Sequence, residues 1–264
     1  MTTAWTTDAA TGDPARAVRL TLFWGLDGVA LRTVGGGRVP DVTEGPLRRR
    51  LDQAELAVVA LDPGLFEGDA GSRATWLNEI DRLDEVAAFG ERFGCGLARV
   101  GALAAEPSDA SADALRQAGD RAAALGLALA VRNDAGTAVA TGAALAALLG
   151  AVGHPAVGAD WRPADALAAG EAPADGLEAL VSAGVPVRCV GVRDGAVVDG
   201  GWADASFGEG DVGWDAHLAA LVRAGADGPL VIDALPEPAR TSGLGAATAL
   251  IRSARRALRG TGRG

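Results

Sequence analysis

Short apolar stretches alternate with helical patterns along the whole of this chain. The clearest is Leu127 to Val131, where five apolar residues follow one another without polar alternation, as is typical of a parallel strand covered on both faces. Eight strand-then-helix units in order, with no long internal repeat, predict an α/β fold that is a single closed (β/α)8 barrel rather than an open doubly wound sheet. The expected strands are residues 1–7, 26–32, 56–61, 97–100 and 127–131, a sixth that begins at 154, and residues 185–192 and 230–233.

Helix signals separate these strands. Asp13-Pro14 is a favourable helix start, and Gly25 is a stop signal. Ser108 is the expected N-cap of a later helix. No domain boundary is visible, so residues 1–264 are expected to form one domain. The expected helices are residues 14–24, 46–54, 75–93, 109–125, 137–152, 215–224 and 246–258, with short helices between 163 and 183, and the glycine-bearing stretches 35–37 and 200–214 are expected to be loops.

Composition narrows the class of protein. The chain is 49% hydrophobic and 22% charged, which is typical of a soluble globular protein, and no apolar run approaches the roughly 20 residues of a membrane span. The first residues lack a basic region followed by a long apolar run, so we expect a cytoplasmic protein without a signal peptide. A net charge of −10 argues against binding to nucleic acid. Cys95 and Cys189 are isolated and suggest no metal or disulfide site, and a homo-oligomer stays possible.

A charged cluster, Arg132-Asn133-Asp134, directly follows the strand that ends at Val131. In a strand-then-helix unit, residues just past the strand lie at the carboxyl end of the sheet, where ligands bind in α/β folds. The sequence therefore predicts a ligand site at this edge.

Three stretches resemble one known family. Residues 127–137, LALAVRNDAGT, resemble a fifth strand that ends Glu-Asn-Glu or Glu-Asn-His before Gly-Thr, and residues 26–32, LDGVALR, resemble Gly-x-Asp-Gly-Val-Glu-Leu-Arg. Trp161-Arg162-Pro163 resembles Trp-Asp-Pro. The chain is thus similar, over nearly its whole length, to the sugar phosphate isomerase/epimerase family, the xylose-isomerase-like TIM barrels. The resemblance implies a TIM barrel, a divalent metal, and isomerisation or epimerisation of a sugar in carbohydrate metabolism.

The resemblance also places the four metal ligands of the family, a Glu, an Asp, a His and a Glu, on Arg132, Arg162, Gly191 and Asp233. An arginine has no lone pair to donate and stays protonated, and a glycine has no side chain to offer. Only Asp233 could still coordinate, and one carboxylate does not make a metal site. We therefore expect that the metal is absent and that the protein carries no cofactor.

Arginines take the place of these ligands. Several are expected to project from strand ends into one mouth, where they would form a local positive pocket suited to bidentate binding of phosphate or carboxylate. Two tryptophans could stack on a sugar face. The expected ligand is an anionic sugar or small acid, bound without catalysis or with metal-free proton transfer at Asp233. The expected ligand-binding residues are Arg132, Arg162, Arg193, Arg99, Arg32, Trp161 and Trp202.

Other interpretations stay open. The arginines could pair with Asp134, Asp160, Asp194 or Asp233 in an inert network, and the tryptophans could pack in the core. Asp233 would then be a salt-bridge partner rather than a base. Alternatively, the site could be rebuilt around other carboxylates as an active metal-dependent isomerase, or the barrel could be an interaction scaffold. The carboxylates available for a rebuilt metal site are Asp62, Asp160 and Asp194.

Overall fold

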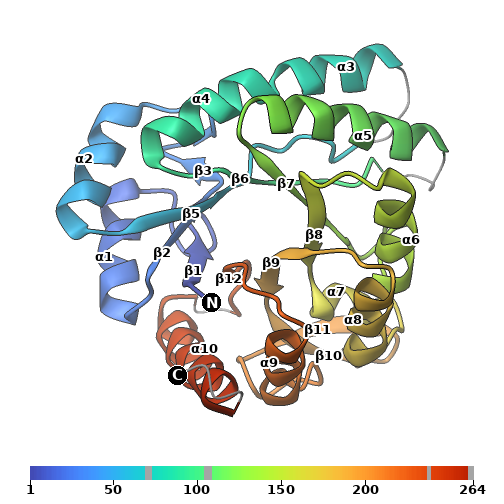
Figure 1. Cartoon of the computed structure of the whole chain (residues 1–264). Coiled ribbons are helices and arrows are strands. Elements are labelled where there is room, and N and C mark those ends of the chain that lie inside the picture. The colour runs from blue at the N-terminus through green and yellow to red at the C-terminus, as the bar shows by residue number, and fades with distance from the viewer. Residues whose placement is uncertain (69–72, 104–108, 237–238, 261–264) are drawn as a thin grey trace.

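The computed structural model describes residues 1–68, 73–103, 109–236 and 239–260. Within these residues, eight parallel strands close into a barrel in the order β1-β12-β9-β8-β7-β6-β5-β2, and helices cover its outside (Figure 1). The predicted (β/α)8 barrel is therefore confirmed. The barrel strands are β1 (Thr3–Thr6), β2 (Gly28–Leu31), β5 (Ala57–Leu61), β6 (Leu97–Val100), β7 (Ala128–Arg132), β8 (Val157–Trp161), β9 (Val187–Val192) and β12 (Leu230–Ile232).

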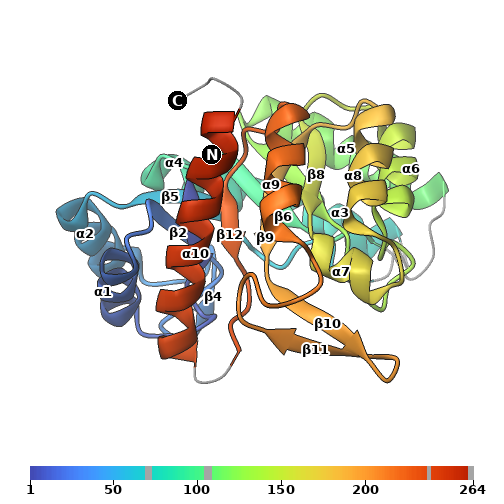
Figure 2. The same cartoon turned by 90° about the horizontal axis from the view of Figure 1, so that it is seen from below.

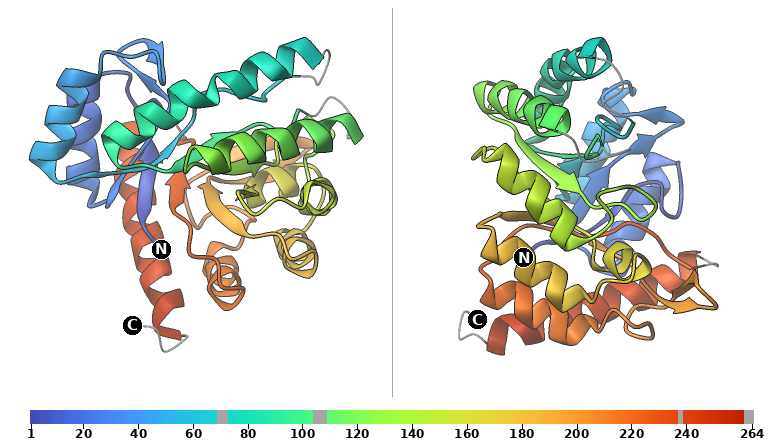
Figure 3. Two further views of the ribbon diagram at one scale, coloured as in Figure 1. Left: turned by 45° about the horizontal axis from the view of Figure 1, so that its top comes forward. Right: turned by 90° about the vertical axis from the view of Figure 1, so that its right-hand side faces the viewer.

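Helices lie around the barrel strands in both views of Figure 3. The first of them follows the predicted signals, because the Asp13 carboxylate accepts hydrogen bonds from the backbone N–H groups of Ala15 and Arg16, and Gly25 ends the helix with positive φ. The helices are α1 (Pro14–Trp24), α2 (Glu44–Ala54), α3 (Arg73–Asp81), α4 (Leu83–Phe93), α5 (Asp109–Ala124), α6 (Gly142–Val152), α7 (Pro163–Ala168), α8 (Pro173–Ser182), α9 (Trp214–Arg223) and α10 (Ala239–Gly260).

The hydrophobic core has two layers. The larger layer fills the space between the strands and the helices. The smaller one lies inside the barrel and is made of small side chains, Ala4, Ala30, Ala60, Ala130, Cys189 and Val231. Because strand residues alternate between the two faces, these small side chains leave room in the barrel interior for one long side chain. Arg99, the neighbour of Ala130 in the β6–β7 ladder, takes that room and is completely buried.

Some predicted helices differ from the structure in their division or their first residue. The helix expected over residues 75–93 is divided into α3 and α4 at Arg82, although hydrogen bonds from Arg82 N to Asn78 O and from Val86 N to Arg82 O run across the division. The helix expected from Thr137 begins only at Gly142. Thr137 instead closes a turn with the carbonyl of Asp134, which is a local side-chain bond that competes with a helix start.

Both expected glycine loops overlap short antiparallel hairpins. Residues 35–37 lie in and beside the hairpin of β3 (Thr33–Val34) and β4 (Gly37–Arg38). The second loop contains part of the hairpin of β10 (Asp194–Val198) and β11 (Gly201–Ala205), which extends away from the barrel (Figure 2). The last helix begins at Ala239, earlier than expected, and Ser108 lies outside the described residues. In the part of the chain that is described, no helix has the length and apolar character needed to cross a membrane.

Candidate functional site

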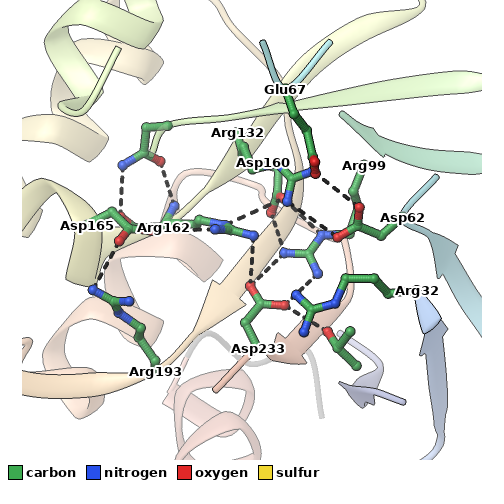
Figure 4. Close-up of polar contacts among 12 residues, drawn as sticks. Arg32, Asp62, Glu67, Arg99, Arg132, Asp160, Arg162, Asp165, Arg193 and Asp233 are labelled. Atoms are coloured by element: carbon green, nitrogen blue, oxygen red, sulfur yellow. Dashed lines mark hydrogen bonds and ion pairs between the residues drawn. The ribbon is translucent and has the colours of Figure 1, made fainter. Parts of the chain in front are cut away.

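Charged side chains from several strands meet at the carboxyl end of the barrel (Figure 4). Because the barrel strands are parallel, residues at or just after their carboxyl ends converge on this one mouth. The arginines expected there are brought together, and each lies beside carboxylates. The labelled residues of the cluster are Arg32, Asp62, Glu67, Arg99, Arg132, Asp160, Arg162, Asp165, Arg193 and Asp233.

Arg99 links two carboxylates beneath the mouth. Its Nε and Nη2 donate to Asp160 at 2.9 and 3.2 Å, and its Nη1 and Nη2 donate to Asp233 at 2.6 and 2.7 Å. Burial acts to lower the pKa of Arg99, but the charges of Asp160 and Asp233 outweigh it and raise that pKa well above its usual value. Arg99 is thus a permanent cation that is committed to these two side chains.

Asp233, the expected base, lies directly after β12. Besides the bonds from Arg99, its Oδ1 accepts a hydrogen bond from the Thr6 hydroxyl at 2.9 Å. Burial acts to raise the pKa of Asp233, but the charges of Arg99 and Arg162 and the hydrogen bonds outweigh it, and the pKa lies well below its ordinary value. A carboxylate with so low a pKa is a weak base at neutral pH. Catalysis by Asp233 stays a prediction. The contacts of Asp233 are those expected if it is a salt-bridge partner rather than a base.

Arg132 pairs with a second group of carboxylates. Its Nη1 and Nη2 lie 3.3 and 3.2 Å from the carboxylate of Asp62, and its Nη2 donates to Glu67 at 2.8 Å. Arg38 reaches the same two acids, at 2.6 and 2.9 Å. Burial acts to raise the pKa of Asp62, but the charges of Arg132, Arg99 and Arg38 lower it overall. Arg132 therefore lies in a local ion-pair cluster.

Arg32 and Arg193 flank the mouth. Arg32 Nε donates to both oxygens of Asp8, at 2.8 and 3.0 Å. Arg193 Nη2 lies 3.1 Å from Asp165, and its guanidinium lies 4.8 Å from the ring centroid of Trp202 in a cation–π contact. Trp202, which was expected to stack on a sugar, thus lies against an arginine of the site.

Arg162 follows β8 and has the loosest pairing in the cluster. Asn133 fixes its backbone, because the Asn133 amide accepts from Arg162 N at 2.8 Å and donates to Arg162 O at 2.9 Å. Its guanidinium lies 3.5 Å from Asp233, 3.7 Å from Asp165 and 3.9 Å from Asp160. Its buried Nε has no hydrogen-bond partner among the described residues. Arg162 therefore keeps donor capacity that the protein does not use.

A cavity of about 200 Å³ opens beside Arg162. Its lining combines cationic and anionic side chains with two small residues at the ends of β9 and β12. The Nε of Arg193, like that of Arg162, is buried and has no hydrogen-bond partner in the described residues. The cavity is lined by Arg32, Arg162, Asp165, Gly191, Arg193, Asp233 and Ala234.

Trp161 does not line this cavity. Its ring is completely buried, and its Nε1 donates to Nε2 of His217 in α9 at 2.9 Å. Burial lowers the pKa of His217 to about 4, so this histidine is neutral at physiological pH. Trp161 therefore packs in the core, as in the alternative to sugar stacking that the sequence left open.

The carboxylates considered for a rebuilt metal site are already engaged. Asp62 and Asp160 pair with arginines, and Asp194 accepts hydrogen bonds from the backbone N–H groups of Gly195, Gly208 and Gly210. Asp194 therefore organises the base of the β10–β11 hairpin. Across the described ranges, no three His, Cys, Asp or Glu side chains are grouped so that they could hold a metal ion.

Several residues of the cluster were missed by sequence reasoning. Asp165 carried a weak signal, since it lies three residues after Arg162 in the first turn of α7. No local pattern marked four other residues, because the side chains that they contact are distant in sequence. These residues are Arg38, Glu67, Asp8 and Thr6.

Comparison with known proteins places this barrel in a family. A family model described as xylose isomerase-like TIM barrel matches residues 18–259. No curated protein sequence matches the chain. The structure is similar to a xylose isomerase domain protein from Planctomyces limnophilus, with 17% identity, a TM-score of 0.77 and 98% of each chain covered.

Two further solved structures show the same barrel. An L-ribulose 3-epimerase is 15% identical, with a TM-score of 0.76 and with 99% of this chain and 97% of the epimerase covered. The probable 3-DHS dehydratase AsbF from Bacillus anthracis is 14% identical, with a TM-score of 0.75 and with 95% and 99% covered. At these identities the likeness shows the fold alone. Because the family model spans most of the chain, this protein belongs to the xylose isomerase-like TIM barrel family.

Proposed function

We propose that this barrel binds a small anionic sugar derivative or small organic acid at the cavity beside Arg162, without a divalent metal and without catalysis. The observation that carries the proposal is the loosely paired guanidinium of Arg162. Arg99 donates to Asp160 and Asp233 at 2.6–3.2 Å, whereas Arg162 lies 3.5–3.9 Å from its carboxylate neighbours. The N–H groups of Arg162 are therefore the donors available to a ligand.

A carboxylate or phosphate oxygen is the acceptor that suits these donors. Guanidinium groups bind such anions through paired N–H bonds, and both Arg162 and Arg193 line the cavity. The cavity of about 200 Å³ is smaller than the roughly 300–1,000 Å³ of drug-sized ligand sites. Its size favours a monosaccharide acid or a smaller acid.

The donor set does not fit the divalent metal that the family resemblance implies. Hard cations such as Mg²⁺ need several free carboxylate or carbonyl oxygens. Here Asp160 and Asp233 share Arg99, and the guanidinium of Arg162 lies beside both of them. A cation entering this space would meet two fixed positive charges. No step through a metal is therefore proposed.

The same pairing argues against proton transfer. General base catalysis needs a carboxylate with a pKa close to the working pH, in reach of the proton that it removes. Asp233 has a pKa lowered by Arg99 and Arg162, and both of its oxygens accept hydrogen bonds from Arg99. The site is better suited to holding an anion than to transferring a proton.

Calorimetric titration tests the proposal. The probes are D-gluconate and D-glucose 6-phosphate, with neutral sorbitol as the matched control, each measured in metal-free buffer and again with EDTA. We expect one of the two anions to bind, sorbitol not to bind, and EDTA to have no effect. Arg162→Gln should weaken binding at least about tenfold.

The control variant is Arg48→Gln, which removes the same charge from an exposed arginine of α2 that lies 3.8 Å from Asp52. It should bind as the wild type does. Binding that needs added Mn²⁺ or Mg²⁺, or that is equally weakened in both variants, would overturn the proposal.

A further inference from the structure

Gly191 borders the cavity and lies at a point where no side chain fits. It belongs to β9 and is the ladder partner of Val231 in β12. A Cβ atom at this position would lie 2.6 Å from Oδ2 of Asp233 and 2.8 Å from Cγ of Arg162. Both distances are far shorter than ordinary van der Waals contact. Its φ lies outside the left-handed region, so space rather than backbone conformation requires glycine here.

The absence of a side chain at position 191 leaves room for the side chain of Arg162. The aliphatic part of Arg162 passes over Gly191, and its guanidinium then lies within 3.5–3.9 Å of Asp233, Asp165 and Asp160. We infer that Gly191 is a positioning residue for Arg162, because a side chain at 191 and the Arg162 guanidinium in its present place exclude each other. The two residues form one unit of the site, although they come from different strands.

This unit accounts for two of the departures from the family pattern at once. By resemblance, Arg162 and Gly191 stand where the family has two metal ligands, an Asp and a His. An arginine at 162 needs the volume that a histidine at 191 would fill. The two exchanges are therefore coupled in this chain, because Arg162 can follow its present path only when position 191 carries no side chain.

The consequence for ligand binding rests on the proposed function. If Arg162 supplies the N–H groups that hold an anion, Gly191 sets the affinity by holding those groups at the cavity wall. Gly191→Ala should then weaken ligand binding chiefly by displacing Arg162, because the added Cβ would lie 2.8 Å from Cγ of that residue.

A set of double variants tests this coupling in the full-length protein. Gly191→Ala is made in the wild type and in three backgrounds, and unfolding midpoints are measured for each. In the wild type it should lower the midpoint by about 4 °C, as expected for overpacking in a protein of this size. With Arg162→Ala the shift should be smaller but should not vanish, because Cγ is gone while the 2.6 Å contact with Oδ2 of Asp233 remains.

Two backgrounds are controls. Arg162→Gln keeps the Cγ atom and should keep the full shift. Arg132→Ala removes an arginine that pairs instead with Asp62 and Glu67, so the shift should again be unchanged. A glycine needed only for packing of the strand would give the same shift in all four cases, and that result would overturn the inference.

The ligand readout separates this inference from the proposed function. Gly191→Ala should weaken binding of whichever of the two anions the wild type binds, about tenfold in the wild type and less than about twofold in the Arg162→Ala background. If the wild type binds neither anion, the proposed function fails, and the inference is still decided by the unfolding midpoints. If an anion binds but Gly191→Ala leaves both affinity and midpoint unchanged, the inference fails alone.

Discussion

Arg99 and Asp233 form a two-bonded ion pair inside the barrel, with Nη1 2.6 Å from Oδ1 and Nη2 2.7 Å from Oδ2. They come from β6 and from the end of β12, and Arg99 has no exposed surface. Charges removed from water are tolerated only when they are paired and hydrogen-bonded. The pair, together with Asp160, therefore ties distant parts of the barrel to one another.

Removing the cation should be costly. Arg99→Met leaves Asp160 and Asp233 buried without their main partner, and we expect a loss of about 3–5 kcal/mol in the free energy of unfolding. Denaturant unfolding monitored by tryptophan fluorescence measures it. Arg92→Met is the control, because Arg92 pairs with Glu44 on the surface, where such pairs contribute at most about 1 kcal/mol. Equal losses in the two variants would contradict the buried network.

His217 should make stability depend on pH. Its pKa is lowered by burial to about 4 in the folded protein, against roughly 6.5 for an unperturbed histidine. The folded state therefore favours the neutral ring. The stability that follows from this preference is complete above about pH 6.5 and is lost progressively as the pH falls toward about 4, by roughly 3 kcal/mol in total.

Unfolding free energies measured at several pH values between about 7 and 4 check this expectation. His217→Gln is the informative variant, because its amide oxygen can still accept the hydrogen bond from Trp161 Nε1 but does not titrate in this range. It should be less stable than the wild type at neutral pH and should show a flatter pH dependence. A slope that persists unchanged in His217→Gln would point to other groups.

The barrel could be predicted from the sequence because its signal is local. Unbroken apolar runs such as Leu127 to Val131 marked the strands, and Asp13 and Gly25 marked the ends of α1. The predicted secondary structure is wrong where local side-chain hydrogen bonds or tight turns determine the backbone conformation. Thr137 bonds to the carbonyl of Asp134 and delays α6, and the β10–β11 hairpin arises in a glycine-bearing stretch with little apolar alternation.

The site could be predicted only in part. Arg132, Arg162 and Arg193 lie at or just after the carboxyl ends of their strands, and the parallel barrel therefore brings them to one mouth, as expected. What each arginine contacts depends on side chains that are far away in sequence, such as Asp62 for Arg132, 70 residues apart. Charge pairing across a barrel has no local pattern, so the balance between free and paired arginines became visible only in three dimensions.

We expect the purified protein to contain little divalent metal. Protein purified without chelator or affinity nickel should contain far less than one equivalent of manganese, magnesium, zinc or cobalt, because Arg99 and Arg162 occupy the surroundings of Asp160 and Asp233. Elemental analysis measures this, and thermal unfolding with each added ion should show no stabilisation. Near-stoichiometric metal, with an unfolding midpoint that rises on metal addition, would instead support a rebuilt metal site and call for isomerase assays.

Asp165 should set the pH dependence of anion binding. It lines the cavity, lies 3.1 Å from Arg193 and 3.7 Å from Arg162, and competes with a ligand for both guanidinium groups. Burial raises its pKa and outweighs the opposing charges of the two arginines, and Asp134 and Asp233 act in the same direction as burial. Asp165 therefore takes up its proton at a higher pH than an exposed aspartate does.

The sign of the effect follows from this competition. As the pH is lowered from neutral into the mildly acidic range, where the ligand itself stays ionised, Asp165 takes up a proton and releases its hold on Arg193 and Arg162, so the affinity for D-gluconate should rise. Asp165→Asn should raise the affinity several-fold at the upper pH and flatten the dependence, whereas Asp175→Asn on the exposed face of α8 should change neither. Titration calorimetry across this range decides the matter. An unchanged pH dependence in Asp165→Asn would show that Asp165 does not compete with the ligand for the guanidinium groups of Arg193 and Arg162.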